Sequence, residues 1–240
     1  MSPSAGPTVV LIHGAFADAS SWSSVIERLQ GEGLPVLAPA LPLRGLESDA
    51  AYIRSVVDSL QGPVVLVGHS YGGAVISVAA SGAPRVKALV YVAAFAPDIG
   101  ESALELTGKF PGSTLGEATA TQLYPLPGGG QGEELVIEQH LFEEQFAAGV
   151  PTGTARVMAV GQRPITLAAL QGKATAAAWK EIPSWYLVAT EDRNIPPAAE
   201  EWMAERAGAH TVSVSAPHAV SVSDPGPVAE LILSAVRSTG

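Results

Sequence analysis

Short apolar runs alternate along the chain with segments whose apolar residues recur at helical spacing. The runs are rich in β-branched residues and apolar throughout, which is typical of parallel strands covered by helices on both faces. The predicted strands are Thr8–His13, Pro35–Pro39, Val64–Gly68, Val86–Ala93, Trp185–Thr190 and Thr211–Ser215. The predicted helices are Ser21–Gln30, Ser48–Leu60, Tyr71–Ser81, Pro197–Ala207 and Pro225–Arg237. The alternation predicts an α/β fold around a mostly parallel, six-stranded sheet with helices on both faces.

The alternation stops in residues 98–180. This stretch contains the Gly/Pro-rich piece Pro125–Gly130, an amphipathic helical segment at Glu133–Ala147 and a second helical stretch at Thr166–Trp179. It is too long for a loop and carries no strand pattern, so we interpret it as an inserted helical cap. The glutamate-rich face of its first helical segment is expected to be solvated. The core domain then consists of residues 1–97 and 181–240.

Composition narrows the class of protein. The 240 residues are 47% hydrophobic and carry a net charge of −10, so we expect neither a nucleic-acid partner nor a membrane surface. The absence of cysteine excludes disulfides, thiolate zinc sites and thiol catalysis. The N-terminus lacks the basic start of a signal peptide, and no run approaches the roughly 20 apolar residues of a membrane span. We therefore expect a cytoplasmic protein, and its oligomeric state, monomer or homodimer, stays open.

The pentapeptide Gly68-His69-Ser70-Tyr71-Gly72 lies between an apolar strand pattern and a helical pattern. In this strand–turn–helix context, a Gly-x-Ser-x-Gly motif predicts that Ser70 is an exposed nucleophile on a sharp turn. The flanking glycines allow the strand and the helix to approach closely. The helix N-terminus adds free N–H groups that can stabilise an oxyanion.

A serine nucleophile needs a base, and five histidines are available. His218 directly follows the last predicted strand, so it lies at the same carboxyl edge of the sheet as the motif. His69 is expected to pack, and His13 to brace a loop. His140 and His210 are expected on the surface. We therefore predict that His218 is the general base.

The base needs an acid that orients it. Asp192 follows the strand Trp185–Thr190, and the order Ser, Asp, His is the one expected for this fold. Glu191 would point to the other side of the strand. Asp98, after the fourth strand, is the competing candidate. The predicted triad is Ser70, Asp192 and His218.

An oxyanion hole needs two backbone N–H groups aimed at the developing charge. One is expected from Tyr71, the residue after the nucleophile. The other is expected from the loop after the first strand, with Ala15 favoured.

His13-Gly14-Ala15-Phe16, the Gly68–Gly73 turn, Glu191-Asp192-Arg193 and Pro217-His218 together resemble the α/β-hydrolase superfamily. Within it, the chain is most similar to the group of methyl esterases and hydroxynitrile lyases. The lyases carry a threonine where Gly14 stands and a lysine where Ala219 stands, so the resemblance favours an esterase. A serine nucleophile also separates the chain from dehalogenases and epoxide hydrolases, which use an aspartate.

These observations predict a serine hydrolase that cleaves small to medium apolar carboxylic esters through an acyl-enzyme, without a metal or organic cofactor. The cap should cover the site. Aromatic residues are candidates for the pocket wall: Phe16, Tyr71, Phe95, Phe142, Phe146 and Trp179. Lactone hydrolysis, acyl transfer and perhydrolysis on the same triad remain alternatives, as does a ligand receptor built on the hydrolase fold.

Overall fold

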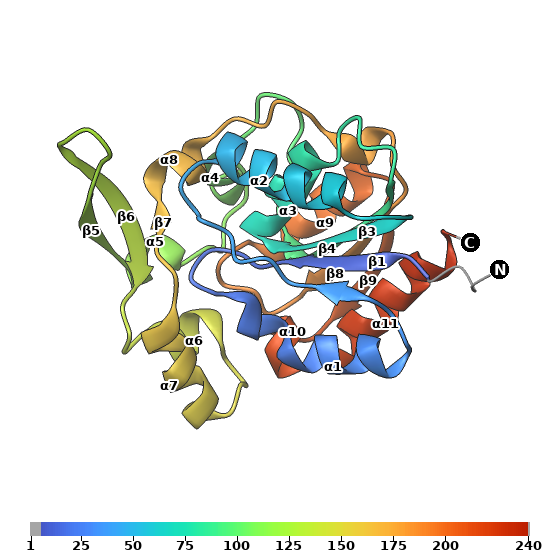
Figure 1. Cartoon of the computed structure of the whole chain (residues 1–240). Helices are drawn as coiled ribbons and strands as arrows, with labels where there is room; N and C mark the ends of the chain where they lie inside the picture. The colour runs from blue at the N-terminus through green and yellow to red at the C-terminus, as the bar shows by residue number, and fades with distance from the viewer. Residues whose placement is uncertain (1–5, 240) are drawn as a thin grey trace.

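A six-stranded parallel sheet forms the centre of the molecule. The computed structural model describes residues 6–239, and Figure 1 shows the sheet between two layers of helices. In spatial order the strands are β2 (Val36–Leu37), β1 (Thr8–Ile12), β3 (Val64–Ser70), β4 (Val86–Ala94), β8 (Ser184–Ala189) and β9 (His210–Val214). Every pairing between neighbours is parallel. The α/β class and the six predicted strands are therefore confirmed.

The two faces of the sheet build two separate apolar layers. Alternate residues of one strand enter different layers: Val10 packs with one and Val9 with the other. One face carries α2 (Leu46–Ser59), α3 (Tyr71–Ala79) and α9 (Pro197–Arg206). The opposite face carries η1 (Ala19–Trp22), α1 (Ser23–Gly31), α10 (Val220–Ser223) and α11 (Pro225–Arg237). The central strands are buried on both sides, which explains why their sequences are apolar throughout.

Much of the stretch between β4 and β8, from β5 to α8, lies at the left of Figure 1. Its helices are α4 (Ala103–Thr107), α5 (Leu115–Ala118), α6 (Phe142–Phe146), α7 (Thr152–Gly161), α8 (Leu167–Gln171) and η2 (Ala178–Lys180). It also contains β5 (Thr119–Pro125), β6 (Gln131–Ile137) and β7 (Ile165–Thr166), which form a second, antiparallel sheet. Among residues 6–239, no helix is both long enough and apolar enough to cross a bilayer.

The second sheet corrects the expectation that this stretch is wholly helical. The segment Glu133–Ala147, predicted as one helix, begins within β6 and reaches α6 only at Phe142. Gly128, Gly129 and Gly130 all have positive φ angles and turn the chain, so that Pro125 pairs with Gln131 across the hairpin. Glycines adopt this backbone conformation without a steric penalty. The glycine turn therefore favours a β-hairpin over a single helix in this segment.

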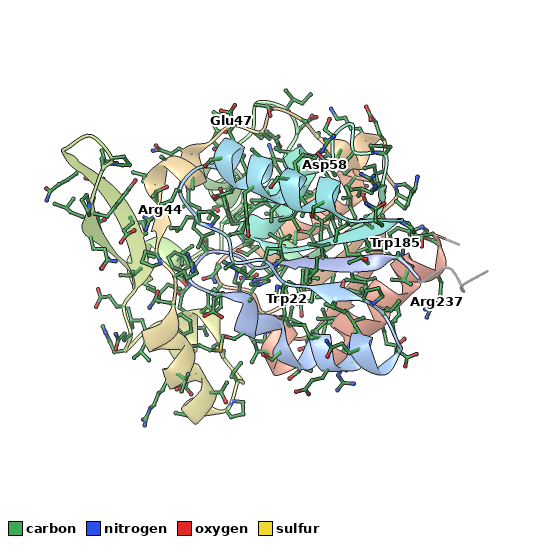
Figure 2. The ribbon with its side chains drawn as sticks, in the orientation of Figure 1. Trp22, Arg44, Glu47, Asp58, Trp185 and Arg237 are labelled. Atoms are coloured by element: carbon green, nitrogen blue, oxygen red, sulfur yellow. The ribbon has the colours of Figure 1, made fainter. Side chains whose placement is uncertain are left out.

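A partly buried ion pair joins the hairpin to the core. The Glu134 side chain is 8% exposed and binds Arg44, which Figure 2 labels on the loop that faces the hairpin. Glu134 also accepts a hydrogen bond of 2.9 Å from Gln122 Nε2 on the paired strand, and the Arg44 guanidinium lies 4.4 Å from the ring centre of Tyr124. Glu134 is thus not on a solvated face, because it anchors the hairpin.

Candidate active site

The turn between β3 and α3 holds Ser70 in a strained conformation. Ser70 has φ 54° and ψ −124°, a region that residues other than glycine rarely adopt. A Cβ atom at Gly68 would lie 2.6 Å from the backbone of Gly72, and one at Gly72 would lie 2.5 Å from the carbonyl oxygen of Ile12. Only glycine fits at these two positions. The sequence motif therefore encodes the tight strand–helix contact that presents Ser70.

Ser70 opens into a cavity of about 380 Å³ between the core and the segment 98–180. The core contributes Ala15, Phe16, Ser70, Tyr71, Phe95 and His218 to its wall. The inserted segment contributes mainly apolar residues, among them Leu104, Phe110, Leu115, Leu135 and Leu170. Apolar walls with a few convergent polar groups are typical of small-molecule sites.

The three residues of the predicted triad come together at this edge of the sheet. The imidazole Nδ1 of His218 lies 2.5 Å from Asp192 Oδ2, and both side chains are almost fully buried. The other oxygen, Asp192 Oδ1, accepts backbone N–H bonds from Asn194 at 2.6 Å and Ile195 at 3.0 Å. This leaves Nε2 as the free ring nitrogen of His218. Ser70 and His218 both line the cavity.

The two competing acids lie elsewhere. Asp98 pairs with Lys180 at 2.5 Å in a partly exposed position, and this hydrogen bond holds the pKa of Asp98 below its usual value. Glu191 is exposed and accepts a hydrogen bond from Ser215. His218 Nδ1 is bonded to Asp192 and to neither of these two residues. The geometry therefore favours Asp192 over both alternatives.

His69 and His13 support neighbouring backbone. His69 Nε2 donates to the carbonyl oxygen of His218 at 2.8 Å, and burial lowers the pKa of His69 well below its usual value. His13 Nδ1 donates to the carbonyl oxygen of Gly14 at 2.8 Å, and its Nε2 accepts from the N–H of Leu41 at 2.9 Å. Burial lowers the pKa of His13 as well. Both imidazoles are therefore uncharged. His69 supports the backbone of His218, and His13 supports the loop that follows β1.

The loop after β1 and the start of α3 lie beside Ser70. A Cβ atom at Gly14 would lie 2.5 Å from Ser70 Cβ, so the loop backbone packs directly on the serine. The N–H of Phe16 is already bonded to the carbonyl oxygen of Arg163 at 3.1 Å. Ala15 and Tyr71, the two residues predicted to form the oxyanion hole, both line the cavity.

Buried hydrogen bonding fixes Tyr71 at the helix start. The phenol of Tyr71 donates to Asp49 Oδ2 at 2.9 Å. Burial raises the pKa of Asp49, and burial together with this neighbour raises the pKa of Tyr71. The phenol hydroxyl therefore anchors α3.

The predicted aromatic wall is only partly present. Phe16 and Phe95 line the cavity, whereas Phe142, Phe146 and Trp179 do not. Phe146 packs edge-on against the ring of His218 with 5.1 Å between ring centres. Trp179 Nε1 donates to the carbonyl oxygen of Pro97 at 2.8 Å within the core. The rest of the wall comes from aliphatic residues of the inserted segment.

Phe16 also borders a second cavity of about 350 Å³, on the side of η1, α7 and α10. It has a positive φ of 59° and is 3% exposed, so the surrounding packing holds it in a strained backbone conformation. Phe16 thus lines both cavities.

Glu200 of α9 is a residue near the site that the sequence analysis did not single out. Its side chain is buried, and it neighbours the carboxylate of Asp192. The helical pattern does indicate its burial, because Glu200 lies on the same face of α9 as the apolar residues Ala199, Met203 and Ala204. Within the described part of the chain, no three His, Asp or Glu side chains are grouped closely enough to bind a metal ion.

Known proteins share this architecture and sequence. An alpha/beta hydrolase of Aspergillus novofumigatus is 28% identical over 252 residues, which cover 95% of this chain and 96% of that protein. The pyrethroid hydrolase of Sphingobium wenxiniae is 30% identical over 247 residues, or 93% of this chain and 85% of that one. The crystal structure of polyneuridine aldehyde esterase has the same fold, with a TM-score of 0.82, 20% identity and coverage of 95% and 98% of the two chains.

Methylesterases and an alpha-hydroxynitrile lyase of Arabidopsis thaliana are also similar to the chain, which confirms the narrower resemblance. The sequence matches the Alpha/beta hydrolase family over residues 9–231. That match takes in β1 to β9 and most of α11. The chain belongs to the alpha/beta hydrolase family.

Proposed function

We propose that the protein is a carboxylic ester hydrolase that works through an acyl-enzyme on Ser70. The observation that carries the proposal is the buried bond between Asp192 Oδ2 and Nδ1 of His218, a residue that lines the same cavity as Ser70. This bond leaves Nε2 of His218 to accept the proton of the serine hydroxyl. The esterases and hydrolases among its relatives support ester cleavage as the general reaction.

The reaction has two stages. Ser70 Oγ attacks the ester carbonyl while its proton moves to His218 Nε2, and the imidazolium then gives this proton to the departing alcohol. Water hydrolyses the acyl-enzyme by the same route, with His218 as the base. Asp192 fixes the tautomer in which Nδ1 carries a proton, and it stabilises the imidazolium.

The backbone N–H groups of Ala15 and Tyr71 hold the oxyanion of the tetrahedral intermediate. Two features support this assignment. The neighbouring Phe16 N–H is already bonded to Arg163, and Tyr71 is the first residue of α3, where N–H groups have no partner within the helix. Each such donor increases the rate by a factor of about 10²–10³.

The substrate is a small to medium ester with an apolar acyl or alcohol part. Residues 98–180 act as a cap over the site, since their leucines and Phe110 form much of the cavity wall. A wall of this kind offers apolar contact and few partners for a sugar or a phosphate. The cavity of about 380 Å³ is large enough for one small ligand.

The test is hydrolysis of p-nitrophenyl acetate and butyrate by the wild type and by Ser70→Ala. The wild type should hydrolyse both esters, and the variant should lose several orders of magnitude in kcat because no acyl-enzyme can form. Ser77→Ala is the matched control, since Ser77 is buried on α3 and bonds to Gly73 and Tyr91 outside the cavity. Retained turnover in Ser70→Ala would contradict the assignment of Ser70 as the nucleophile.

A further inference from the structure

Glu200 is a buried carboxyl group without an obvious charge partner. It projects from α9 and is 0% exposed. Its Oε2 accepts a hydrogen bond of 3.1 Å from the N–H of Ala189 at the end of β8. Its Oε1 receives no N–H or O–H from any residue in the described range 6–239. One oxygen of a fully buried acid is therefore left facing something other than a donor.

Another carboxyl group lies beside it. Asp192 is close enough to Glu200 to share a hydrogen bond with it, and the charge of Asp192 acts on Glu200. The other titratable groups that act on Glu200 are Tyr186 of β8 and Glu201 on its own helix, and neither supplies a positive charge. His218, which could carry one, is bonded through Nδ1 to Asp192.

Two buried carboxyls in contact cannot both be ionised without a large cost, so one keeps a proton. Asp192 is the better anion, because it accepts two backbone N–H bonds and the Nδ1–H of His218. Glu200 has only the N–H of Ala189. Burial and the charge of Asp192 both raise the pKa of Glu200 well above its usual value, which agrees with this assignment.

We infer that Glu200 is a positioning residue: as a neutral acid, it donates a hydrogen bond to the Asp192 carboxylate and holds it against His218. This role rests on the proposed function, because it acts through Asp192. Asp192 then accepts bonds from Asn194, Ile195, Glu200 and His218, so its carboxylate is held from all sides. An oriented acid keeps the imidazole in place, and a displacement of about 1 Å can cost 10²-fold in rate.

The test compares Glu200→Gln with Glu200→Met. Glutamine keeps an N–H donor of similar shape toward Asp192, whereas methionine fills the space and donates nothing. On p-nitrophenyl butyrate, Glu200→Gln should keep a kcat close to that of the wild type. Glu200→Met should lose kcat by about 10²-fold with little change in KM, because Asp192 loses its support and the pocket does not change.

Two further readouts separate positioning from a purely structural role. In the wild type, kcat should fall at high pH as Glu200 ionises, and this fall should be absent from Glu200→Gln. Infrared difference spectra of the wild type against Glu200→Gln at neutral pH should show the carbonyl band of a protonated carboxylic acid. This band does not depend on activity and should persist in Ser70→Ala, so it tests the protonation even if the protein proves not to be an esterase.

The inference is overturned if Glu200→Met folds and keeps the wild-type kcat, or if Glu200→Gln is as slow as Glu200→Met. It is also overturned if the infrared difference spectrum lacks the protonated band. Should Glu200→Met fail to fold, the spectrum and the pH profile of Glu200→Gln decide the matter by themselves.

Discussion

Replacing Asp192 by asparagine tests the arrangement around His218 without changing the size of the side chain. Two backbone N–H groups, from Asn194 and Ile195, donate to Oδ1 of Asp192. Because these donors need an acceptor, the amide oxygen of the new asparagine must take the Oδ1 position. Its NH₂ group then faces Nδ1 of His218, which must give up its proton to accept the new bond.

The consequence is a histidine in the wrong tautomer. With Nδ1 as an acceptor, the proton sits on Nε2, and His218 cannot accept a proton from Ser70. In a Ser-His-Asp triad, this change lowers kcat by about 10⁴-fold, which corresponds to about 5 kcal/mol of transition-state stabilisation. The overall fold should persist, because all backbone hydrogen bonds at the site keep a partner.

The assay is steady-state hydrolysis of p-nitrophenyl butyrate, with thermal unfolding measured in parallel. Asp98→Asn is the matched control, since Asp98 pairs with Lys180 at the surface and does not line the cavity. We expect Asp98→Asn to hydrolyse the ester at nearly the wild-type rate. The reasoning is refuted if folded Asp192→Asn keeps more than about a tenth of the wild-type kcat, or if Asp98→Asn falls equally far.

Three other substitutions test separate parts of the structure. Gly14→Ala would place a Cβ atom 2.5 Å from that of Ser70. This crowding should lower kcat, and it should lower the free energy of unfolding by about 1–3 kcal/mol, which is typical of overpacking, together with the melting temperature. Gly153→Ala, which has open space around it, should change neither kcat nor the melting temperature. Phe16→Ala would join the cavities of about 380 and 350 Å³. For p-nitrophenyl esters, the kcat/KM for long acyl chains relative to that for acetate should then rise about tenfold. An unchanged ratio would contradict this role for Phe16. Burial raises the pKa of Glu200 in the folded protein. The contribution of Glu200 to the free energy of unfolding is therefore complete below the usual glutamate pKa, and it is lost as the pH rises toward the pKa of Glu200 in the folded protein. Glu200→Gln should therefore gain stability over the wild type with rising pH, by up to about 1.4 kcal/mol per pH unit in denaturant titrations, and equal stability at every pH would refute the shift.

The sequence predicts the core well because each part of it is specified locally. An apolar run without alternation indicates a buried parallel strand, and the six predicted strands all lie in the sheet. The triad candidates follow from the same logic. Ser70 is the last residue of β3, and Asp192 and His218 lie in the loops that follow β8 and β9. Because parallel strands end at a common edge, the topology brings the three residues to one place.

The inserted segment was harder to predict because its structure depends on contacts distant in sequence. Leu135, Val136 and Ile137 fit a helical pattern together with the residues after them, yet they pair with the strand at Thr119–Pro125. The run of glycines at 128–130 was the available signal for a hairpin, since consecutive glycines favour a turn. Nothing local could show that Glu134 would be buried against Arg44, a residue 90 positions away.

The aromatic wall shows the same limit. Phe142 and Phe146 were expected in the pocket by residue type, but both rings pack behind it in the core. Glu200 was overlooked for the opposite reason, because glutamates on helices are usually solvated. Its buried position depends on how α9 packs against β8, which only the tertiary structure reveals.

Labelling with an active-site-directed fluorophosphonate tests the central claim most directly. The protein should gain the mass of one phosphonyl group, and peptide mapping should place this group on Ser70, because the reagent needs a nucleophile activated by His218. Ser70→Ala should gain no mass, and Asp192→Asn should react far more slowly than the wild type. A label on another residue, or equal labelling of the wild type and Ser70→Ala, would contradict the account.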